Sequence, residues 1–242
     1  MYNCYSKPIS TGVGVRGFIK TLALAVEELA TANAEAFGYG REAVANLGGF
    51  WVISKIRFSL LGYPESGEKL IAETWPLPPS KIKVERQYRI KNEGGEVLAN
   101  GTSEWCILSC ENRRPLRIES DVFSGGRRYI TEQSGAGDFT RLRAEVSDSN
   151  FCYEREITAE DIDLNNHTNN KKYTEMVLEC FSDEYLNSNP ILVYELHFVK
   201  ETMLGEKISV YKTETEQGVL VTGISGGNVV FRAGMEFFNG KN

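Results

Sequence analysis

The sequence predicts an α+β protein made of two similar units, in each of which an antiparallel sheet wraps around one central helix. Two stretches in which apolar residues recur with helical spacing begin near Phe18 and near Asn170. Each is followed by a run of segments rich in β-branched and aromatic residues, which is typical of strands. A helix followed by such a run favours a sheet packed on that helix, and two units side by side can bury each other's open faces.

The first unit has its helix from Phe18 onward, where apolar residues recur at steps of four and three, and we expect the helix to end at Gly38 or Gly40. Its strands are predicted at 51–61, from near Lys69, at 81–91 and at 97–108, with turns at 62–67 and 92–95. The alternation of side chains that marks a half-buried strand is clearest at 81–91. The side chains on one face of this predicted strand are Ile82, Val84, Arg86, Tyr88 and Ile90.

Residues 109–150 hold several glycines and no sustained periodicity, so they are interpreted as a connecting segment. A short strand at 151–156 and a helix from about Asn170 follow, and the helix carries Tyr173, Val177, Cys180 and Phe181 on one stripe. Further strands are predicted at 191–200, 207–215, 219–225 and 228–238. We therefore place the first unit at 1–130, a linker at 131–150 and the second unit at 151–242.

The composition is that of a globular protein, since 41% of the 242 residues are hydrophobic and 25% are charged. No apolar run approaches the roughly 18 residues of a membrane span, and the start lacks a signal-peptide pattern. We expect a cytoplasmic protein. The five cysteines form an odd set without the spacing of zinc or redox motifs, and they are interpreted as reduced core thiols.

Charge is divided unevenly along the chain. Residues 1–140 hold 17 Lys and Arg against 16 Asp and Glu, whereas residues 141–242 hold 10 against 17. A net acidic protein without a basic tail is a poor nucleic-acid binder, because phosphate contacts dominate that affinity. An acidic partner is expected to dock on the first half, where the basic groups include Lys81, Lys83, Arg86 and Arg89, and Arg113, Arg114, Arg117, Arg127 and Arg128.

The most informative stretch is residues 161–173, which read Asp-Ile-Asp-Leu-Asn-Asn-His-Thr-Asn-Asn-Lys-Lys-Tyr. In an extended backbone the side chains of Asp163, Asn165 and His167 point the same way. A carboxylate, a carboxamide and an imidazole can together hold a water and polarise a carbonyl, and the start of the following helix can supply backbone N–H groups for an oxyanion. The alternative is an Asn-rich helix entry in which these residues only cap backbone amides.

This stretch resembles the Asp-x-Asp-x-Asn-x-His-x-Asn-Asn-x-x-Tyr signature of acyl-acyl carrier protein (acyl-ACP) thioesterases. The resemblance extends over most of the chain, through Trp51-Val52-Ile53 to Tyr63-Pro64, through 102–105 and through 112–118. It implies a tandem double hot-dog fold and hydrolysis of the thioester of fatty acyl-ACP, which ends fatty acid synthesis. It also implies ACP as the partner, no cofactor and no metal, and we allow for a homodimer.

The family's catalytic Asp, Asn, His and Glu fall on Asp163, Asn165, His167 and Glu201. Plant members have a cysteine after that Glu, and here the position is Thr202. A threonine hydroxyl is barely ionised near neutral pH, so we favour direct attack by water, with Glu201 or His167 as the base. Which of the two is the base is left open by the sequence.

One feature conflicts with this assignment, because strict alternation places Glu201 on the face of Glu195 and His197, opposite the face expected to pack inward. A bulge or a strand end near Lys200 could re-aim it. His197 is interpreted as structural. Asp161, Asn169, Asn170 and Tyr173 are assigned to loop support and capping. The resemblance further implies that the first helix and residues 46–49 shape the acyl channel.

Two alternative functions stay open. The first is an acyl-CoA thioesterase of the hot-dog class, although most of those resemble a single unit that dimerises. The second is a non-catalytic sensor that binds acyl thioesters, for which we would expect a lost site and an appended output module. Because no Arg- and Ser-rich segment precedes Met1, a prokaryotic enzyme is expected.

Overall fold

The structure is a computed structural model that describes residues 4–118, 128–143, 145–163 and 167–238. The helices are α1 (Gly14–Ala36), α2 (Arg41–Ala45), α4 (Asn170–Glu179) and α5 (Asp183–Ser188). The strands are β1 (Tyr5–Ser10), β2 (Gly49–Leu60), β3 (Lys69–Pro76), β4 (Val84–Asn92), β5 (Val97–Ser109), β6 (Phe151–Glu156), β7 (Ile191–Phe198), β8 (Lys207–Thr215), β9 (Gly218–Ser225) and β10 (Asn228–Phe237). Sequence analysis missed β1, α2 and α5.

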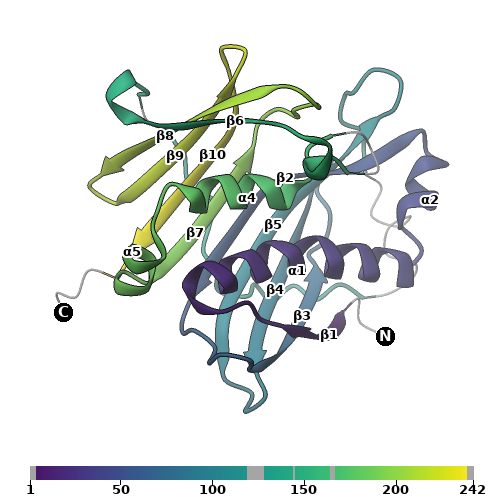
Figure 1. Cartoon of the computed structure of the whole chain (residues 1–242). Helices are drawn as coiled ribbons and strands as arrows, with labels where there is room; N and C mark the ends of the chain where they lie inside the picture. The colour runs from purple at the N-terminus through teal and green to yellow at the C-terminus, as the bar shows by residue number, and fades with distance from the viewer. Residues whose placement is uncertain (1–3, 119–127, 144, 164–166, 239–242) are drawn as a thin grey trace.

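The described strands form one ten-stranded sheet in the order β1-β3-β4-β5-β2-β7-β10-β9-β8-β6. Read from its outer edge inward, each half has the same order of first, third, fourth, fifth and second strand. All named pairs are antiparallel. The expected duplication is therefore visible in the topology, with α1 and α4 lying on the same side of the sheet, which curls around them (Figure 1).

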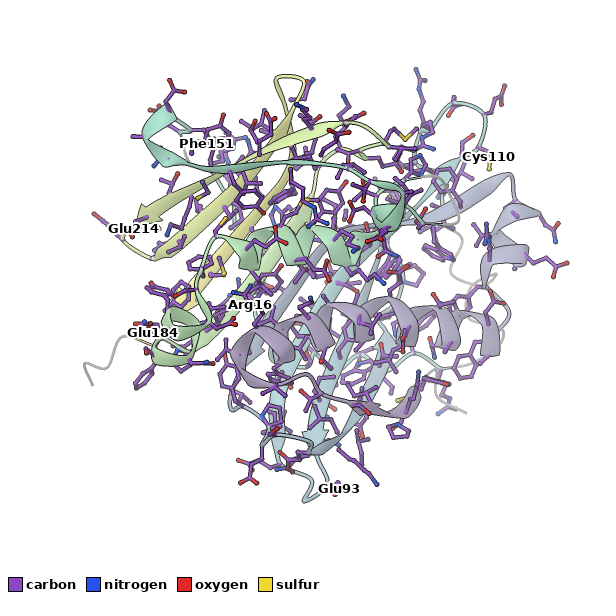
Figure 2. The ribbon with its side chains drawn as sticks, in the orientation of Figure 1. Arg16, Glu93, Cys110, Phe151, Glu184 and Glu214 are labelled. Carbon is purple, nitrogen blue, oxygen red and sulfur yellow. The ribbon has the colours of Figure 1, made fainter. Side chains whose placement is uncertain are left out.

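The two halves join edge to edge through β2 and β7, where Lys55 faces His197 and Arg57 faces Glu195. An exposed edge strand leaves backbone N–H and C=O groups unpaired, and this pairing satisfies those of both central edges. The same seam brings α1 close to the helices of the second half. Arg16 of α1 donates to Asp183 Oδ1 at 2.5 Å and to the carbonyl of Phe181 at 2.7 Å, beside α5 (Figure 2).

Helix α1 buries the predicted stripe, since Phe18, Leu22 and Leu29 have no exposed surface. The helix ends before Gly38, whose φ of 80° is readily adopted only by a residue without a Cβ. On the facing strand β4, Tyr88 and Ile90 are also fully buried, as the alternation predicts, but the prediction is wrong for Ile82, which lies before the strand and is 50% exposed. Among the described residues no helix is long and apolar enough to cross a membrane.

Within the connecting segment, residues 128–143 run over the outer face of the sheet from the first half to the second. The Trp75 indole N–H donates to the carbonyl of Glu132 at 2.8 Å, and the Ser134 amide donates to Gln87 Oε1 at 2.9 Å. Further along the segment, the Thr140 amide donates to Glu195 Oε1 at 2.9 Å. Residues 128–143 contain no helix or strand, and hydrogen bonds such as these hold them in place.

Glu195 is the charged residue buried at the seam, with 1% of its surface exposed. Burial acts to raise its pKa, but hydrogen bonds from His197 and Arg57 outweigh burial and hold the pKa below its ordinary value. The His197 Nε2 atom lies 2.7 Å from Glu195 Oε1, and the ring packs edge-on against Phe139. These contacts support the predicted structural role of His197.

The five cysteines are all unpaired in the structure. The prediction that they are core residues is wrong for Cys4 and for Cys110, which are exposed. Cys110 lies in the loop after β5, where the chain has left the sheet (Figure 2). Burial raises the pKa of the Cys106 and Cys180 thiols, which favours their neutral, unreactive form.

Candidate active site

The loop between β6 and α4, which carries the polar cluster, is anchored at Asp161. This carboxylate accepts hydrogen bonds from Arg155 at 2.6 Å and from the amide of Thr158 at 3.0 Å, and its backbone carbonyl accepts from the amide of Asn169 at 2.8 Å. Burial acts to raise the pKa of Asp161, yet the Thr158 hydrogen bonds and the Arg155 charge outweigh it and keep the pKa low. A buried, ionised residue thus fixes both ends of the loop.

Asp163 and His167 face each other across this loop. The amide of Asp163 donates to the carbonyl of His167 at 2.8 Å, and the amide of His167 donates to Asp163 Oδ1 at 3.3 Å. Ile162 and Thr168 form an isolated antiparallel bridge just below them. Backbone pairing therefore holds residues 161–163 beside residues 167–169, with the aspartate on one side and the histidine on the other. Asn165 lies outside the described residues.

Glu201 reaches the same place from the end of β7. The strand ends at Phe198, and the amides of Val199 and Lys200 both donate to the carbonyl of Val230, at 2.9 and 3.1 Å. Two successive residues opposite one acceptor break the alternation. This strand end re-aims Glu201, so that one carboxylate oxygen lies 3.4 Å from His167 Nε2. The conflict noted in the sequence is resolved in the way expected.

Arg113 brings the first half of the chain into the site. It lies in the loop after β5, and its guanidinium pairs with the same Glu201 oxygen that faces His167. The backbone at Arg113 is left-handed, with a φ of 59°. The guanidinium of Arg113 lies 5.0 Å from the ring centroid of Phe50. The candidate base of the second half is thus held by a cation from the first half.

Thr202, next to Glu201, points the other way and has no exposed surface. Its hydroxyl lies 2.7 Å from the Thr168 hydroxyl and 2.9 Å from the Tyr173 hydroxyl. Its carbonyl accepts from the amide of Thr168 at 3.0 Å. These contacts connect the loop, α4 and the end of β7, and they give Thr202 a structural place in the core.

Helix α4 begins at the rim of the site. Asn169 caps it by accepting a hydrogen bond from the amide of Lys171 at 3.1 Å, and Tyr173 packs on the core through Phe198 and Phe231. The support roles predicted for Asp161, Asn169 and Tyr173 agree with these contacts. Asn170, the first helical residue, lines a small cavity of about 10 Å³ that Glu27 of α1 also lines.

Glu27 adds a carboxylate from the first half to this neighbourhood. Burial raises its pKa, and the negative charge of Asp163 raises it further. The effect of Asp163 on Glu27 places α1 within electrostatic reach of the loop. Sequence analysis did not single out Glu27, because it has the ordinary pattern of a half-exposed helix position.

A second, larger cavity of about 70 Å³ continues along α1 inside the first half. Its wall is mostly apolar and aromatic, and includes Ala30, Ala34, Tyr39, Trp51, Val84 and Trp105. Trp105 lines both cavities. The first helix lines the cavity, as expected for a channel wall, but residues 46–49 are not among the residues that line it.

The structure therefore brings together His167, Glu201 and the backbone of Asp163 at the junction of the two halves. Arg113 was missed as a site residue, although the stretch that holds it had been singled out for its resemblance and its charge. The site is open to solvent on one side, since 38% of the Glu201 side chain is exposed.

Comparison with family models gives two matches in the expected order. The model of the acyl-ACP thioesterase N-terminal domain matches residues 11–125, and that of the acyl-ACP thioesterase C-terminal domain matches residues 145–230. Among curated proteins, oleoyl-acyl carrier protein thioesterase 2, chloroplastic, of Arabidopsis thaliana is 22% identical over 232 residues, covering 90% of this chain and 63% of that protein. The corresponding Coriandrum sativum thioesterase is 23% identical over 243 residues, covering 93% and 64%. The chain thus spans less than two thirds of these relatives.

Solved structures agree over nearly the whole chain. The crystal structure of an acyl-ACP thioesterase from Bacteroides thetaiotaomicron VPI-5482 superposes with a TM-score of 0.87 and 21% identity, covering 97% of this chain and 98% of that one. The 12:0-ACP thioesterase from Umbellularia californica gives a TM-score of 0.84 and 20% identity, with 97% of each chain covered. These likenesses confirm the expected α+β, tandem double hot-dog fold. Since the two family models together match most of the sequence, the chain belongs to the acyl-ACP thioesterase family.

Proposed function

We propose that this protein hydrolyses the thioester of fatty acyl-ACP to free fatty acid and ACP, and so ends fatty acid synthesis. The observation that carries the proposal is the meeting of His167 and Glu201, 3.4 Å apart, in a chain whose first half holds an apolar cavity. An imidazole and a carboxylate can activate water, and the cavity offers an apolar environment for an alkyl chain.

In the proposed reaction a water molecule attacks the thioester carbonyl carbon. Glu201 or His167 takes a proton from the water as the new C–O bond forms, and the carbonyl oxygen becomes an oxyanion. Collapse of this tetrahedral intermediate breaks the C–S bond. The proton held by the base then neutralises the thiolate of the leaving carrier group, which leaves the enzyme unchanged.

Two groups are proposed to polarise the carbonyl. One is Asn165, as the family resemblance implies, and the other is the backbone N–H of Asn170 at the start of α4. The positive end of the helix dipole favours an oxyanion at this position. Asp163 is assigned an orienting role, which is supported by its backbone and side-chain hydrogen bonds with His167.

We assign the two halves different tasks. Residues 1–130 form the unit that holds the acyl chain, residues 151–242 form the catalytic unit, and residues 131–150 link them. The position of the larger cavity under α1 supports the first assignment, and the origin of His167 and Glu201 in the second half supports the second. The matched N-terminal and C-terminal domain models also divide the chain near the linker.

ACP is proposed to dock beside the site opening, where the loop after β5 presents Arg113, Arg114 and Arg117 as exposed residues. The expected contribution of Arg86 to docking is wrong, because only 4% of its surface is exposed. Lys83 is engaged by Glu104, and Arg127 lies outside the described residues. We also propose a cytoplasmic location and allow for a homodimer.

The test is release of free fatty acid from a panel of acyl-ACPs and matching acyl-CoAs of increasing chain length. The proposal expects fast turnover with acyl-ACP and slower turnover with acyl-CoA. Preference for acyl-CoA would assign the protein to the other hot-dog thioesterases. Tight binding of acyl thioesters without release of acid would support the non-catalytic sensor.

A further inference from the structure

The wall of the larger cavity carries a positive charge, for which a neutral alkyl chain offers no partner. Arg86 of β4 lines it, and its residue surface is only 4% exposed. Its guanidinium donates to Asn33 Oδ1 at 2.9 Å and to Thr74 Oγ1 at 3.3 Å. Both acceptors are neutral, and an arginine side chain remains protonated in proteins. A full positive charge therefore lies at the wall of an apolar space.

No carboxylate balances this charge among the described residues. The residues that line the cavity in the described ranges include neither aspartate nor glutamate. The acidic residues on the neighbouring strands are engaged elsewhere, since Glu73 pairs with Lys91, and Glu85 and Glu104 pair with Lys83. Burying an ion without a counter-charge is unfavourable, so a ligand that supplies an acceptor oxygen would gain strongly here.

The position of Arg86 along the cavity indicates which part of a ligand it meets. The smaller cavity near the catalytic loop is lined by Glu27 of α1, and the larger one by Ala34. Seven helical residues separate the two, which corresponds to about 10 Å along the helix axis. A thioester at His167 therefore leaves Arg86 beside the far part of the chain rather than beside the reacting carbonyl.

We propose that the cavity selects acyl chains bearing a hydrogen-bond-accepting oxygen, such as a hydroxyl or carboxylate, far from the thioester, and that Arg86 binds this oxygen. The chain would lie against Trp51 and Trp105, with its oxygen accepting from the guanidinium. Arg86 is then a specificity-determining residue. Only the orientation of the chain, with its thioester end at His167, rests on the proposed function.

Binding of pantetheine thioethers tests this inference without any turnover, because a thioether cannot be hydrolysed. The panel pairs S-alkyl pantetheines with analogues of equal chain length that end in a hydroxyl or a carboxylate, over about 8 to 16 carbons, a range that brackets the roughly 10 Å from Glu27 to Ala34 along α1. Binding is followed by tryptophan fluorescence, since two of the three tryptophans, Trp51 and Trp105, line the cavity. A charge-assisted hydrogen bond should make at least one oxygen-bearing chain bind about tenfold tighter than its plain counterpart.

Two variants identify the residue responsible. Arg86→Met replaces the cation by an apolar side chain of similar length and should abolish the preference, whereas Val84→Ala changes the same wall without a polar group and should keep it. Equal or tighter binding of plain chains at every length by the wild-type protein would overturn the inference, even if Arg86→Met failed to fold. A preference that survives in folded Arg86→Met would overturn it too. Acyl-ACP turnover is measured separately, so its failure would refute the proposed function alone.

Discussion

His167 and Glu201 meet through a single carboxylate oxygen, which lies 3.4 Å from the imidazole Nε2 and also pairs with the guanidinium of Arg113. The histidine comes from the loop before α4, the glutamate from the end of β7, and the arginine from the loop after β5 of the other half. The candidate site thus requires both halves to be in place.

Arg113→Gln is predicted to lower kcat about tenfold or more, because the guanidinium that holds the Glu201 carboxylate beside His167 is lost. Initial rates at saturating acyl-ACP measure this, with Arg114→Gln as the control from the same loop. A kcat equal to that of Arg114→Gln would contradict the positioning role of Arg113.

Thr202→Ala is predicted to destabilise the fold while keeping hydrolysis in the folded fraction. The variant removes a buried hydroxyl bonded to Thr168 and Tyr173, and the free energy of unfolding should fall by about 1–3 kcal/mol. Urea unfolding and rates per folded molecule measure the two effects, and Thr202→Ser should restore most of the stability. Loss of turnover in well-folded Thr202→Ala would favour a covalent route through this residue.

Asp161→Asn is predicted to lower stability at neutral pH but not at strongly acidic pH. The folded-state pKa of Asp161 lies below its usual 3.8, so its charge stabilises the folded protein above that value. This contribution is lost as the pH falls through the folded-state pKa. We expect a loss of about 1–3 kcal/mol at pH 7, reduced because Arg155 is partly exposed to solvent.

Urea unfolding of both proteins at pH 7 and at pH 3 checks the Asp161 prediction. The exposed neighbour Glu160, changed to Gln, is the matched control and should alter stability little. An equal deficit of Asp161→Asn at both pH values would show that the loop is held by packing rather than by the ionised carboxylate.

Docking of ACP is predicted to weaken with salt and with loss of positive charge beside the site. Arg114→Glu should raise KM for acyl-ACP on the order of fivefold, because ACP is acidic and like charges would then face each other. Small acyl-N-acetylcysteamine thioesters lack the carrier and should show no such rise. A KM for acyl-ACP that is unchanged by added salt would remove the electrostatic docking surface from the proposal.

Much of the fold could be predicted because the spacing of apolar residues along the chain indicates which side chains are buried. The stripe on α1 and the alternation on β4 place Leu22 and Tyr88 in the core as the structure does. The alternation also placed Arg86 on the apolar face of its strand, which is where the structure has it. The positive charge of Arg86, from which we expected a docking role, was the weaker indication. Strand β1 was missed because it is a short edge strand that contains Pro8.

The site was predictable only in part, because its members lie far apart in the sequence. The loop motif identified Asp163 and His167, whereas Glu201 required the family resemblance and a break in strand alternation. No local pattern connects Arg113 with Glu201, which are 88 residues apart and meet only because β2 and β7 join the two halves. A left-handed arginine backbone is likewise invisible in the sequence.

The most direct measurement is the rate of fatty acid release from acyl-ACP by the wild-type protein, Glu201→Gln, His167→Ala and Thr202→Ala under identical conditions. The account predicts rapid release by the wild type, a loss of at least about a hundredfold for the first two variants, and near-normal release per folded molecule for the third. Full activity in folded Glu201→Gln and His167→Ala would contradict it.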